Sequence, residues 1–418
     1  MSVIGNWMQK VAQAWLVLEL TDSGTLLGLT AALQHLPTLL LTPYGGLLAD
    51  RVDKRKILII AQAASAVPAL LLGLLTASGA VTLWMILLLA LILGVIEAFE
   101  KPARHSFPIE MVGPEHLTNA IALSTIVINA GRVIGPAIAG LLITTVGLSA
   151  SFLLNALSFG AVVAGLLLIR PGQLYRSPPA KRAPGQLREG LRYVRRQPAL
   201  LWPLILMAVS GMLAYEWIVT LPLLARETFN GGANIAGLMF AAMGCGAIIG
   251  GLAIAAWLEA SPERLVITGL LFSGILVLLS LAPTLPTAYG LLFILGAASI
   301  AFRSIATSLI QLRAGAEMRG RVMALLVVAI GGTTPVGAPL VGWIGDVMGA
   351  RAPLMVGGLA TAVACLVTHL LLRRHDREPA DVPDTRNAER INAVPVAGQA
   401  ADCTGPGRHH VHSEPAGL

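Results

Sequence analysis

The chain has 418 residues, of which 56% are hydrophobic and only 12% are charged, and its mean hydropathy is +0.76. Soluble domains carry about 25% charged residues, so this composition argues against a water-soluble enzyme. The net charge of +7 would suggest nucleic acid in a soluble protein, but here cationic loops that orient membrane helices explain it better. The sequence therefore predicts a membrane protein with no nucleic-acid partner.

Long uncharged runs predict paired membrane helices. Residues 57–96, 133–169 and 265–302 contain no charged side chain, and each run is about twice the ~20 residues that cross the hydrocarbon core as a helix. The runs are too long for strands and show no strict alternation, so helices are favoured. The predicted fold is all-α with twelve spans, at residues 3–20, 26–48, 57–76, 82–101, 119–143, 149–169, 200–224, 233–257, 265–283, 287–308, 322–344 and 353–372.

The basic residues predict an orientation. If the loop after the second span is cytoplasmic, nearly every Lys and Arg outside the spans falls on the cytoplasmic side, and only Arg226 and Arg351 fall on the other. Positive residues accumulate in cytoplasmic loops. We therefore expect a multi-pass protein of the cell (inner) membrane with both termini in the cytoplasm.

The segment 170–199 separates six spans from six. This predicts an N-terminal half at 1–169, a cytoplasmic linker at 170–199, a C-terminal half at 200–373 and a tail at 374–418. In the linker, Leu187, Leu191 and Val194 recur at helical spacing between basic residues, which predicts a short amphipathic helix on the anionic inner leaflet. The polar tail is predicted to be disordered.

Cofactor and metal sites are not predicted. Cys245, Cys365 and Cys403 are scattered, with no CxxC pair. The tail histidines 409, 410 and 412 have the chemistry to bind a metal, but chance composition is the favoured explanation. No Gly-Lys pair occurs, which excludes a P-loop motif, so direct ATP hydrolysis is not expected. The energy source we expect is an ion gradient, most simply protons.

A short internal repeat relates the two halves. The fifth span contains Gly135-Pro-Ala-Ile-Ala-Gly140 followed by Gly147, and the eleventh contains Gly337-Ala-Pro-Leu-Val-Gly342 followed by Gly349. The internal spacings are the same in both. Two six-helix halves repeated in parallel are a known transporter plan, with the substrate site near the bilayer midplane between the halves.

Ionisable residues inside membrane spans are costly and mark functional sites. Glu216 and Arg132 lie about halfway along the seventh and fifth spans, Lys10 lies in the first, and Arg303 lies in the tenth, from where it can snorkel to the interface. Carboxyl groups in apolar cavities exchange protons near neutrality, so Glu216 is the candidate for proton coupling. Arg132 is a candidate to bind an anionic substrate group or to balance Glu216. Lys10 and Arg303 are further candidates, and structural bridges to neighbouring helices remain the alternative.

Two carboxylates near the end of the fourth span are expected to be structural. Glu97 and Glu100 stand four residues before Lys101 and Arg104, a spacing that predicts ion pairs on one helix face near the interface. His35 in the second span is a further titratable residue without a predicted partner.

The loop after the second span carries the most specific motif. It contains Gly46, then Asp50, Arg51, Asp53 and Arg55, and it resembles the signature loop of the major facilitator superfamily in sequence and in position. The resemblance implies that Gly46, Asp50, Arg51 and Arg55 latch the two halves at the cytoplasmic face and favour the outward-open state. Asp53 stands where the superfamily more often has glycine.

A second motif lies in the fifth span. Gly131, Gly135, Pro136 and Gly140 resemble the antiporter motif of exporters in this superfamily, although the paired glycines at its end are reduced to Gly140. Glycines at this spacing permit close helix packing, and proline bends a helix. The resemblance implies that this helix seals the pathway against leak; ordinary glycine-rich packing is the alternative.

Three further stretches resemble one branch of the superfamily, that of the enterobactin exporter and the transmembrane secretion effectors. They are residues 14–21, 187–196 and 318–323. Members usually have a basic stretch and half of the first span before the position of Gly5, whereas only Met1 to Ile4 precede it here. We therefore expect a shortened first helix, which also contains Lys10 and four other polar residues.

These features together predict a secondary active transporter, a proton-coupled exporter of a small amphiphilic compound (siderophore or drug-like) that works by alternating access. The expected partners are the small-molecule substrate, protons and membrane lipid. A lipid translocator on the same fold and a non-transporting membrane sensor or scaffold remain alternatives. An enzyme is not expected, since no nucleophile–base pair or metal-ligand constellation is visible in the sequence.

Overall fold

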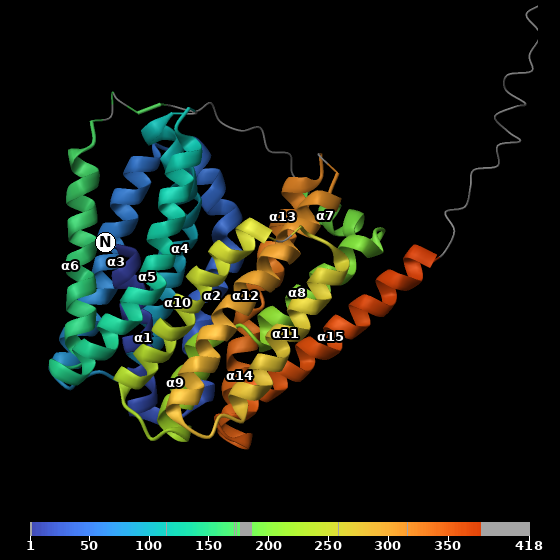
Figure 1. Cartoon of the computed structure of the whole chain (residues 1–418). Helices are drawn as coiled ribbons and strands as arrows, with labels where there is room; N and C mark the ends of the chain where they lie inside the picture. Colours follow the sequence, from blue (N-terminus) through green and yellow to red (C-terminus); the bar gives the residue numbers. More distant parts are fainter. Residues whose placement is uncertain are drawn as a thin grey trace, which may run out of the picture. The chain divides into compact units, whose positions relative to one another are not determined.

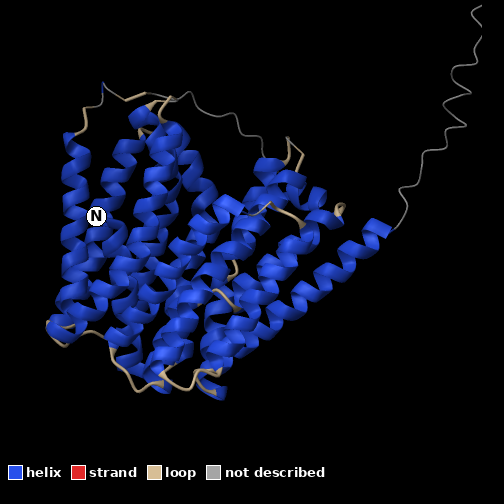
Figure 2. Cartoon of the chain, in the orientation of Figure 1, coloured by secondary structure: helices blue, strands red, loops and turns tan. Residues whose placement is uncertain are grey.

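The computed structural model describes residues 2–113, 115–170, 172, 174–175, 186–257, 259–315 and 317–377. Within these ranges the chain is built of helices joined by loops and contains no strand (Figure 2). The tail that was predicted to be disordered, with its three histidines, lies outside the described residues except for its first few positions. The same is true of most of the linker between residues 171 and 185.

Most of the helices follow one another with short connections, and the longest gap lies between α6 and α7 (Figure 1). They are α1 (Ser2–Thr21), α2 (Gly24–Arg51), α3 (Lys54–Ala77), α4 (Leu83–Val112), α5 (Leu117–Thr145), α6 (Leu148–Leu168), α7 (Gln186–Arg195), α8 (Pro198–Leu213), α9 (Trp217–Leu223), the π-helical turn η2 (Leu224–Thr228), α10 (Ala233–Trp257), α11 (Pro262–Ser280), α12 (Leu285–Arg313), α13 (Arg319–Gly331), α14 (Thr334–Met348) and α15 (Ala352–Arg377).

Eleven segments of the described chain are long and apolar enough to cross a membrane, and they correspond to the second to twelfth predicted spans. Two of them are composite. The seventh span, Pro198–Thr228, consists of α8, α9 and η2, and the eleventh, Arg319–Met348, consists of α13 and α14. The all-helical membrane fold is therefore confirmed, with interruptions that hydropathy did not predict.

The first predicted span forms the 20-residue helix α1 but is not among the eleven apolar segments. Its polar side chains are turned inward: Gln9 and Gln13 are only 4% and 5% exposed, and α1 packs against α5, α6 and α9. The Gln9 side chain accepts a hydrogen bond from Asn155 of α6 at 2.6 Å. Because protein surrounds this helix, it needs less apolar surface than a helix that faces lipid.

The internal repeat has a structural counterpart. A methyl group placed on Gly135 would lie 2.7 Å from the Ile4 carbonyl oxygen of α1, and one on Gly337 would collide with the Met212 carbonyl of α8. Each motif thus packs on the first spanning helix of its own half. The second glycines reach across to the other half, because Gly140 contacts α10 and Gly342 contacts the start of α2. Both halves therefore use the repeated glycines in the same way.

The linker helix α7 forms where the amphipathic pattern predicts it. Val194 is buried in a hydrophobic core formed mostly by residues of the C-terminal half, while Leu191 is 40% exposed. Glu189 pairs with Arg321 of α13 at 2.9 Å, and the Tyr193 hydroxyl accepts a hydrogen bond from the Gly315 amide at 3.2 Å. Part of the apolar face of α7 thus packs on protein, rather than all of it facing the lipid surface as the sequence suggested.

Candidate functional site

A cavity of about 380 Å³ lies between the two halves. It is lined from the N-terminal half by α1, α2 and α5, and from the C-terminal half by the α8–α9 junction, α10, α12 and the α13–α14 junction. All four ionisable candidates from the sequence line it: Lys10, Arg132, Glu216 and Arg303. Arg303 therefore faces the cavity, although its position near the helix end had suggested snorkelling to the interface.

Glu216 stands at a break in the seventh span. Helix α8 ends at Leu213, and α9 begins at Trp217 with Glu216 as its N-cap residue. The residue is 4% exposed, and its Oε1 atom has no hydrogen-bond partner among the described residues. Thr334, at the start of α14, lines the cavity beside this carboxyl group. Broken membrane helices are typical of transporter binding sites.

Aromatic side chains hold this break in place. The Tyr215 hydroxyl donates to the Ser299 carbonyl of α12 at 3.0 Å. The Tyr215 ring stacks on Phe272 at a centroid distance of 5.1 Å, and Phe272 stacks on Phe302 at 5.8 Å. Trp217 meets Phe272 edge-on at 6.3 Å. Since Phe272 and Phe302 are fully buried, the unwound backbone on either side of Glu216 rests on a rigid aromatic base.

Two cations of the N-terminal half share one aromatic ring. The Lys10 Nζ atom lies 5.3 Å from the centre of the Trp7 ring, and the Arg132 guanidinium carbon lies 5.6 Å from it. Both distances are typical of cation–π contacts. The Arg132 Nε atom is buried and has no hydrogen-bond partner within the described part of the chain. No ion pair joins Arg132 to Glu216 among the described residues, so Arg132 as the counter-charge of Glu216 remains a prediction.

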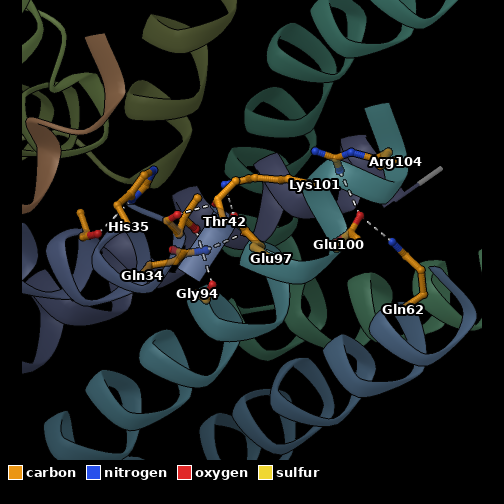
Figure 3. Close-up of polar contacts among 11 residues, drawn as sticks. Gln34, His35, Thr42, Gln62, Gly94, Glu97, Glu100, Lys101 and Arg104 are labelled. Atoms are coloured by element: carbon orange, nitrogen blue, oxygen red, sulfur yellow. Dashed lines mark hydrogen bonds and ion pairs between the residues drawn. The ribbon is translucent and has the colours of Figure 1, made fainter. Parts of the chain in front are cut away.

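A polar cluster extends from this cavity into the N-terminal half (Figure 3). Glu97 pairs with Lys101 at 2.7 Å and accepts from the Gln34 amide of α2 at 3.2 Å. A small pocket of about 10 Å³ touches Lys10, Gln13, Gln34 and Glu97. Since Lys10 and Gln34 line both hollows, the cluster is continuous with the cavity.

The second predicted pair of α4 is also formed. Glu100 pairs with Arg104 at 3.2 Å and accepts from the Gln62 amide of α3 at 3.0 Å (Figure 3). Glu100 is 2% exposed, whereas the Arg104 side chain is 39% exposed, so this pair joins a buried carboxylate to a guanidinium that reaches the protein surface; its position near the membrane interface stays a prediction. The sequence did not identify Gln34 and Gln62 as partners, because a single amide in an apolar run does not show which helix it faces.

The gate motif links helices of its own half. Arg55 donates to the carbonyl oxygens of Leu166 and Leu167 at the end of α6, at 2.7 and 3.0 Å. Asp53 caps the start of α3 by accepting from the Arg55 amide at 2.9 Å. Asp50 is half-buried at the end of α2, and Arg51 is exposed.

The same region holds α2 close to α4. Gly46 is buried, and a methyl group on the preceding Gly45 would lie 3.0 Å from the Phe99 Cα atom of α4. Lys54 forms an ion pair with Glu110 of α4. Helices α2 and α4 therefore pack closely at Gly45, next to the Gly46 of the motif.

The antiporter-like motif uses two faces of α5. Gly131 and Gly135 contact α1, where a methyl group would lie 2.6 Å from the Val3 Cγ1 atom and 2.7 Å from the Trp7 Cβ atom, respectively. On the other face, a methyl group on Gly140 would lie 2.9 Å from the Asn234 Cα atom of α10. A methyl group on Gly237 of α10 would lie 2.5 Å from the Pro136 carbonyl oxygen. The motif therefore lies in a backbone-to-backbone contact between the halves.

One carboxylate joins the halves at the end where α2 begins. Asp346, near the end of α14, accepts from the Gly24 amide at 2.5 Å and the Thr25 amide at 2.9 Å. It also accepts from the hydroxyls of Ser23 and Thr25, at 2.9 and 2.6 Å. Asp22 forms a further cross-half ion pair with Arg226. We call this the Asp346 end; the sequence had not singled out Asp346.

Comparison with known proteins identifies the family. A family model described as transmembrane secretion effector matches residues 1–406. The chain belongs to this family. Its relatives include the staphyloferrin A transporter of Staphylococcus aureus, which is 24% identical over 380 residues covering 89% of this chain and 94% of that protein. The macrolide efflux protein A of Streptococcus pyogenes is 26% identical over 378 residues, covering 87% and 91%.

The multidrug efflux pump Tap of Mycobacterium tuberculosis is also similar, with 26% identity over 391 residues covering 87% of this chain and 89% of the pump. Among solved structures, a bacterial homologue of the human lysosomal transporter Spinster, in an inward-facing and unoccupied conformation, superposes with a TM-score of 0.72. It has 16% identity and covers 89% of this chain and 95% of that one. This secretion effector is thus a multi-pass membrane transporter of the major facilitator superfamily and not an enzyme.

Proposed function

We propose that this secretion effector is a proton-coupled exporter of small amphiphilic compounds that works by alternating access. The observation that carries the proposal is the buried carboxyl group of Glu216, whose Oε1 atom has no partner among the described residues and which lines a cavity between the two halves. Relatives named for macrolide efflux, multidrug efflux and staphyloferrin A transport support an amphiphilic substrate of low molecular weight.

Proton exchange at Glu216 follows from its surroundings. A carboxylate in an apolar site lacks the solvation that stabilises its charge, so intramembrane carboxyl groups commonly act in proton relays. The break between α8 and α9 leaves this side chain at a helix start rather than on a continuous helix face. A change in the packing of the two halves would therefore alter its contact with water, which is the requirement for moving a proton in alternating access.

Gradient-driven efflux from inverted vesicles tests this role. We expect Glu216→Gln to abolish efflux driven by a proton gradient while the protein still reaches the membrane. Glu227→Gln is the matched control, because Glu227 lies on the same span but is exposed and does not line the cavity. Unchanged gradient-driven efflux in Glu216→Gln would remove the coupling assignment.

Alternating access requires contacts that form and break between the halves. Asp346 contributes such a contact, since it holds the N-terminus of α2 through two backbone amides and two hydroxyls. Carboxylates are favourable at helix N-termini. Asp50 lies at the other end of α2, in the gate motif. The resemblance of this motif to the signature loop of the superfamily implies that it latches the halves at the cytoplasmic face, in the outward-open state. We propose that the two aspartates act at opposite ends in turn, so that Asp346 stabilises the conformation closed at the Asp346 end.

Spin labels on Ser78 and Pro283 measure this conformation, because both residues are exposed in loops at the Asp346 end, one from each half. The labels require cysteines at these two positions in a chain without its native cysteines. We expect Asp346→Ala to lengthen the distance between the labels. Ser261→Ala is the matched control, since it removes a helix cap within one half, where Ser261 accepts from the Arg264 amide. A distance that stays the same in Asp346→Ala would contradict the assignment.

The distribution of basic residues supports placing the Asp50 end and both termini in the cytoplasm and the chain in the inner membrane. Labelling of single cysteines from each side of the membrane tests this orientation. A lipid translocator remains the second candidate on this fold, and lipid movement that needs no proton gradient would favour it. A sensor or scaffold would show no flux and would need its tail to bind a partner.

A further inference from the structure

The cavity between the halves contains more positive than negative charge. Lys10 and Arg132 line it from the N-terminal half, and Arg303 lines it from the C-terminal half. None of the three forms an ion pair among the described residues, although Glu97, which pairs with Lys101, lines the small pocket beside Lys10 and attracts it electrostatically. Glu216 is the carboxyl group that lines this cavity; Thr334 contributes a hydrogen bond to it, but it has no ion-pair partner within the described chain and its Oε1 atom has no hydrogen-bond partner there.

Unpaired cations in a membrane interior are unfavourable, because buried charges are normally stabilised by a counter-charge. The Trp7 ring fixes the positions of Lys10 and Arg132, but an aromatic face has no net negative charge. The buried Arg132 Nε atom still lacks a partner. A ligand with a carboxylate or a comparable acidic group would supply the counter-charge and the hydrogen-bond acceptor that the protein does not provide.

We propose that the substrate of this transporter is a zwitterionic amphiphile. Its acidic group binds between Lys10, Arg132 and Arg303, and its basic group binds to Glu216. The apolar body contacts Trp217, Phe240 and Met243, which line the same cavity. Small-molecule sites commonly combine an apolar lining with a few polar groups that fix orientation.

The basic group of the substrate is inferred from the proposed proton exchange at Glu216, so this part of the inference rests on the proposed function. An exporter that exchanges its substrate for protons needs the two to exclude each other. A purely acidic substrate would favour the protonated form of Glu216 and would therefore move together with the proton. A positive group beside Glu216 would instead displace the proton, so only a substrate with both charges satisfies the cations and the exchange.

Three dyes with one ring system separate these charges. Unsubstituted rhodamine with a free benzoate is a zwitterion, its methyl ester has only the positive charge, and fluorescein has only acidic groups. Binding is measured by fluorescence anisotropy with the full chain in nanodiscs of uncharged lipid. We expect the rhodamine acid to bind about tenfold more tightly than its ester, as is typical when a hydrogen-bonded charged group is lost.

Substitutions of the cavity cations test whether they cause the difference in affinity between the rhodamine acid and its ester. Arg132→Gln and Lys10→Gln should each weaken binding of the rhodamine acid about tenfold and leave its ester unchanged. Arg264→Gln is the charge-matched control, since Arg264 lies at the start of α11 outside the cavity. The melting temperature of each variant shows whether it is folded. Equal binding of acid and ester, equal effects of the variants on both dyes, or no binding of either dye would overturn the proposal.

Proton release tests the basic group. Binding of the rhodamine acid in a weakly buffered solution should release protons, whereas binding of fluorescein should not, and Glu216→Gln should abolish the release. Release of protons with fluorescein, or none with the rhodamine acid, would refute the zwitterion. These measurements use no gradient. If the rhodamine acid and its ester bind differently but efflux does not respond to a proton gradient, the proton coupling is refuted and the acidic group of the substrate stands. If efflux responds to the gradient but acid and ester bind equally, the coupling stands and the zwitterionic substrate is refuted.

Discussion

The contact between α5 and α10 allows the alternating-access proposal to be tested by adding one methyl group. A methyl carbon on Gly237 would lie 2.5 Å from the Pro136 carbonyl oxygen and 3.2 Å from the Gly140 Cα atom. These are backbone atoms of another helix, which cannot rotate away. Since such atoms normally stay about 3.5 Å apart, the two helices must separate by roughly 1 Å to accept alanine.

Forcing extra volume into a close contact costs about 1–3 kcal/mol. In Gly237→Ala this cost falls only on the conformation in which α5 and α10 touch. In the other conformation of the alternating-access cycle the two halves separate at the Asp346 end, so the added methyl group meets no backbone there. A free-energy difference of this size shifts a two-state equilibrium by about 5- to 150-fold. We therefore expect Gly237→Ala to move the population strongly towards the conformation open at the Asp346 end.

Gly250→Ala is the matched control on the same helix. A methyl group on Gly250 would also lie 2.5 Å from a backbone atom, the Ala297 Cα atom of α12, but α12 belongs to the same half. This substitution should lower the melting temperature without changing the distance between spin labels on Ser78 and Pro283. The reasoning is refuted if Gly237→Ala leaves that distance unaltered, or if Gly250→Ala changes it as much.

Three further substitutions test the stability of single elements. Phe272→Ala removes a fully buried ring that stacks on Tyr215, and it should lower the free energy of unfolding by about 3–5 kcal/mol. The melting temperature should fall, and it should fall less for Phe272→Leu, which retains part of the buried side chain. Arg55→Ala removes two hydrogen bonds to the end of α6, worth about 1.5–3 kcal/mol; hydrogen exchange at Leu168 should quicken, and an unchanged rate would argue against the contact. Gly349 has a φ of +90°, so Gly349→Ala should cost about 1–3 kcal/mol, and an unaltered melting temperature would show that the turn relaxes.

The halves are held together by features that the sequence indicated only in part. The antiporter-like glycines were recognisable, because small residues at regular spacing predict close packing. Their partners were not, since nothing in the sequence states that Pro136 faces Gly237 or that Asp346 caps α2. Asp346 stands in an ordinary helix end, and its role depends on a contact more than 300 residues away along the chain.

The sequence by itself determined the helices of this transporter and the positions of its motifs, because burial in lipid requires long apolar runs and the gate loop has a recognisable pattern. Only the tertiary structure decided three matters. The seventh span is interrupted before Trp217, the polar face of α1 is buried in protein, and four ionisable residues from distant helices line one cavity. The physical reason is that hydropathy reports whether a segment can enter the membrane, whereas the direction each side chain faces is set by the packing of helices remote in sequence.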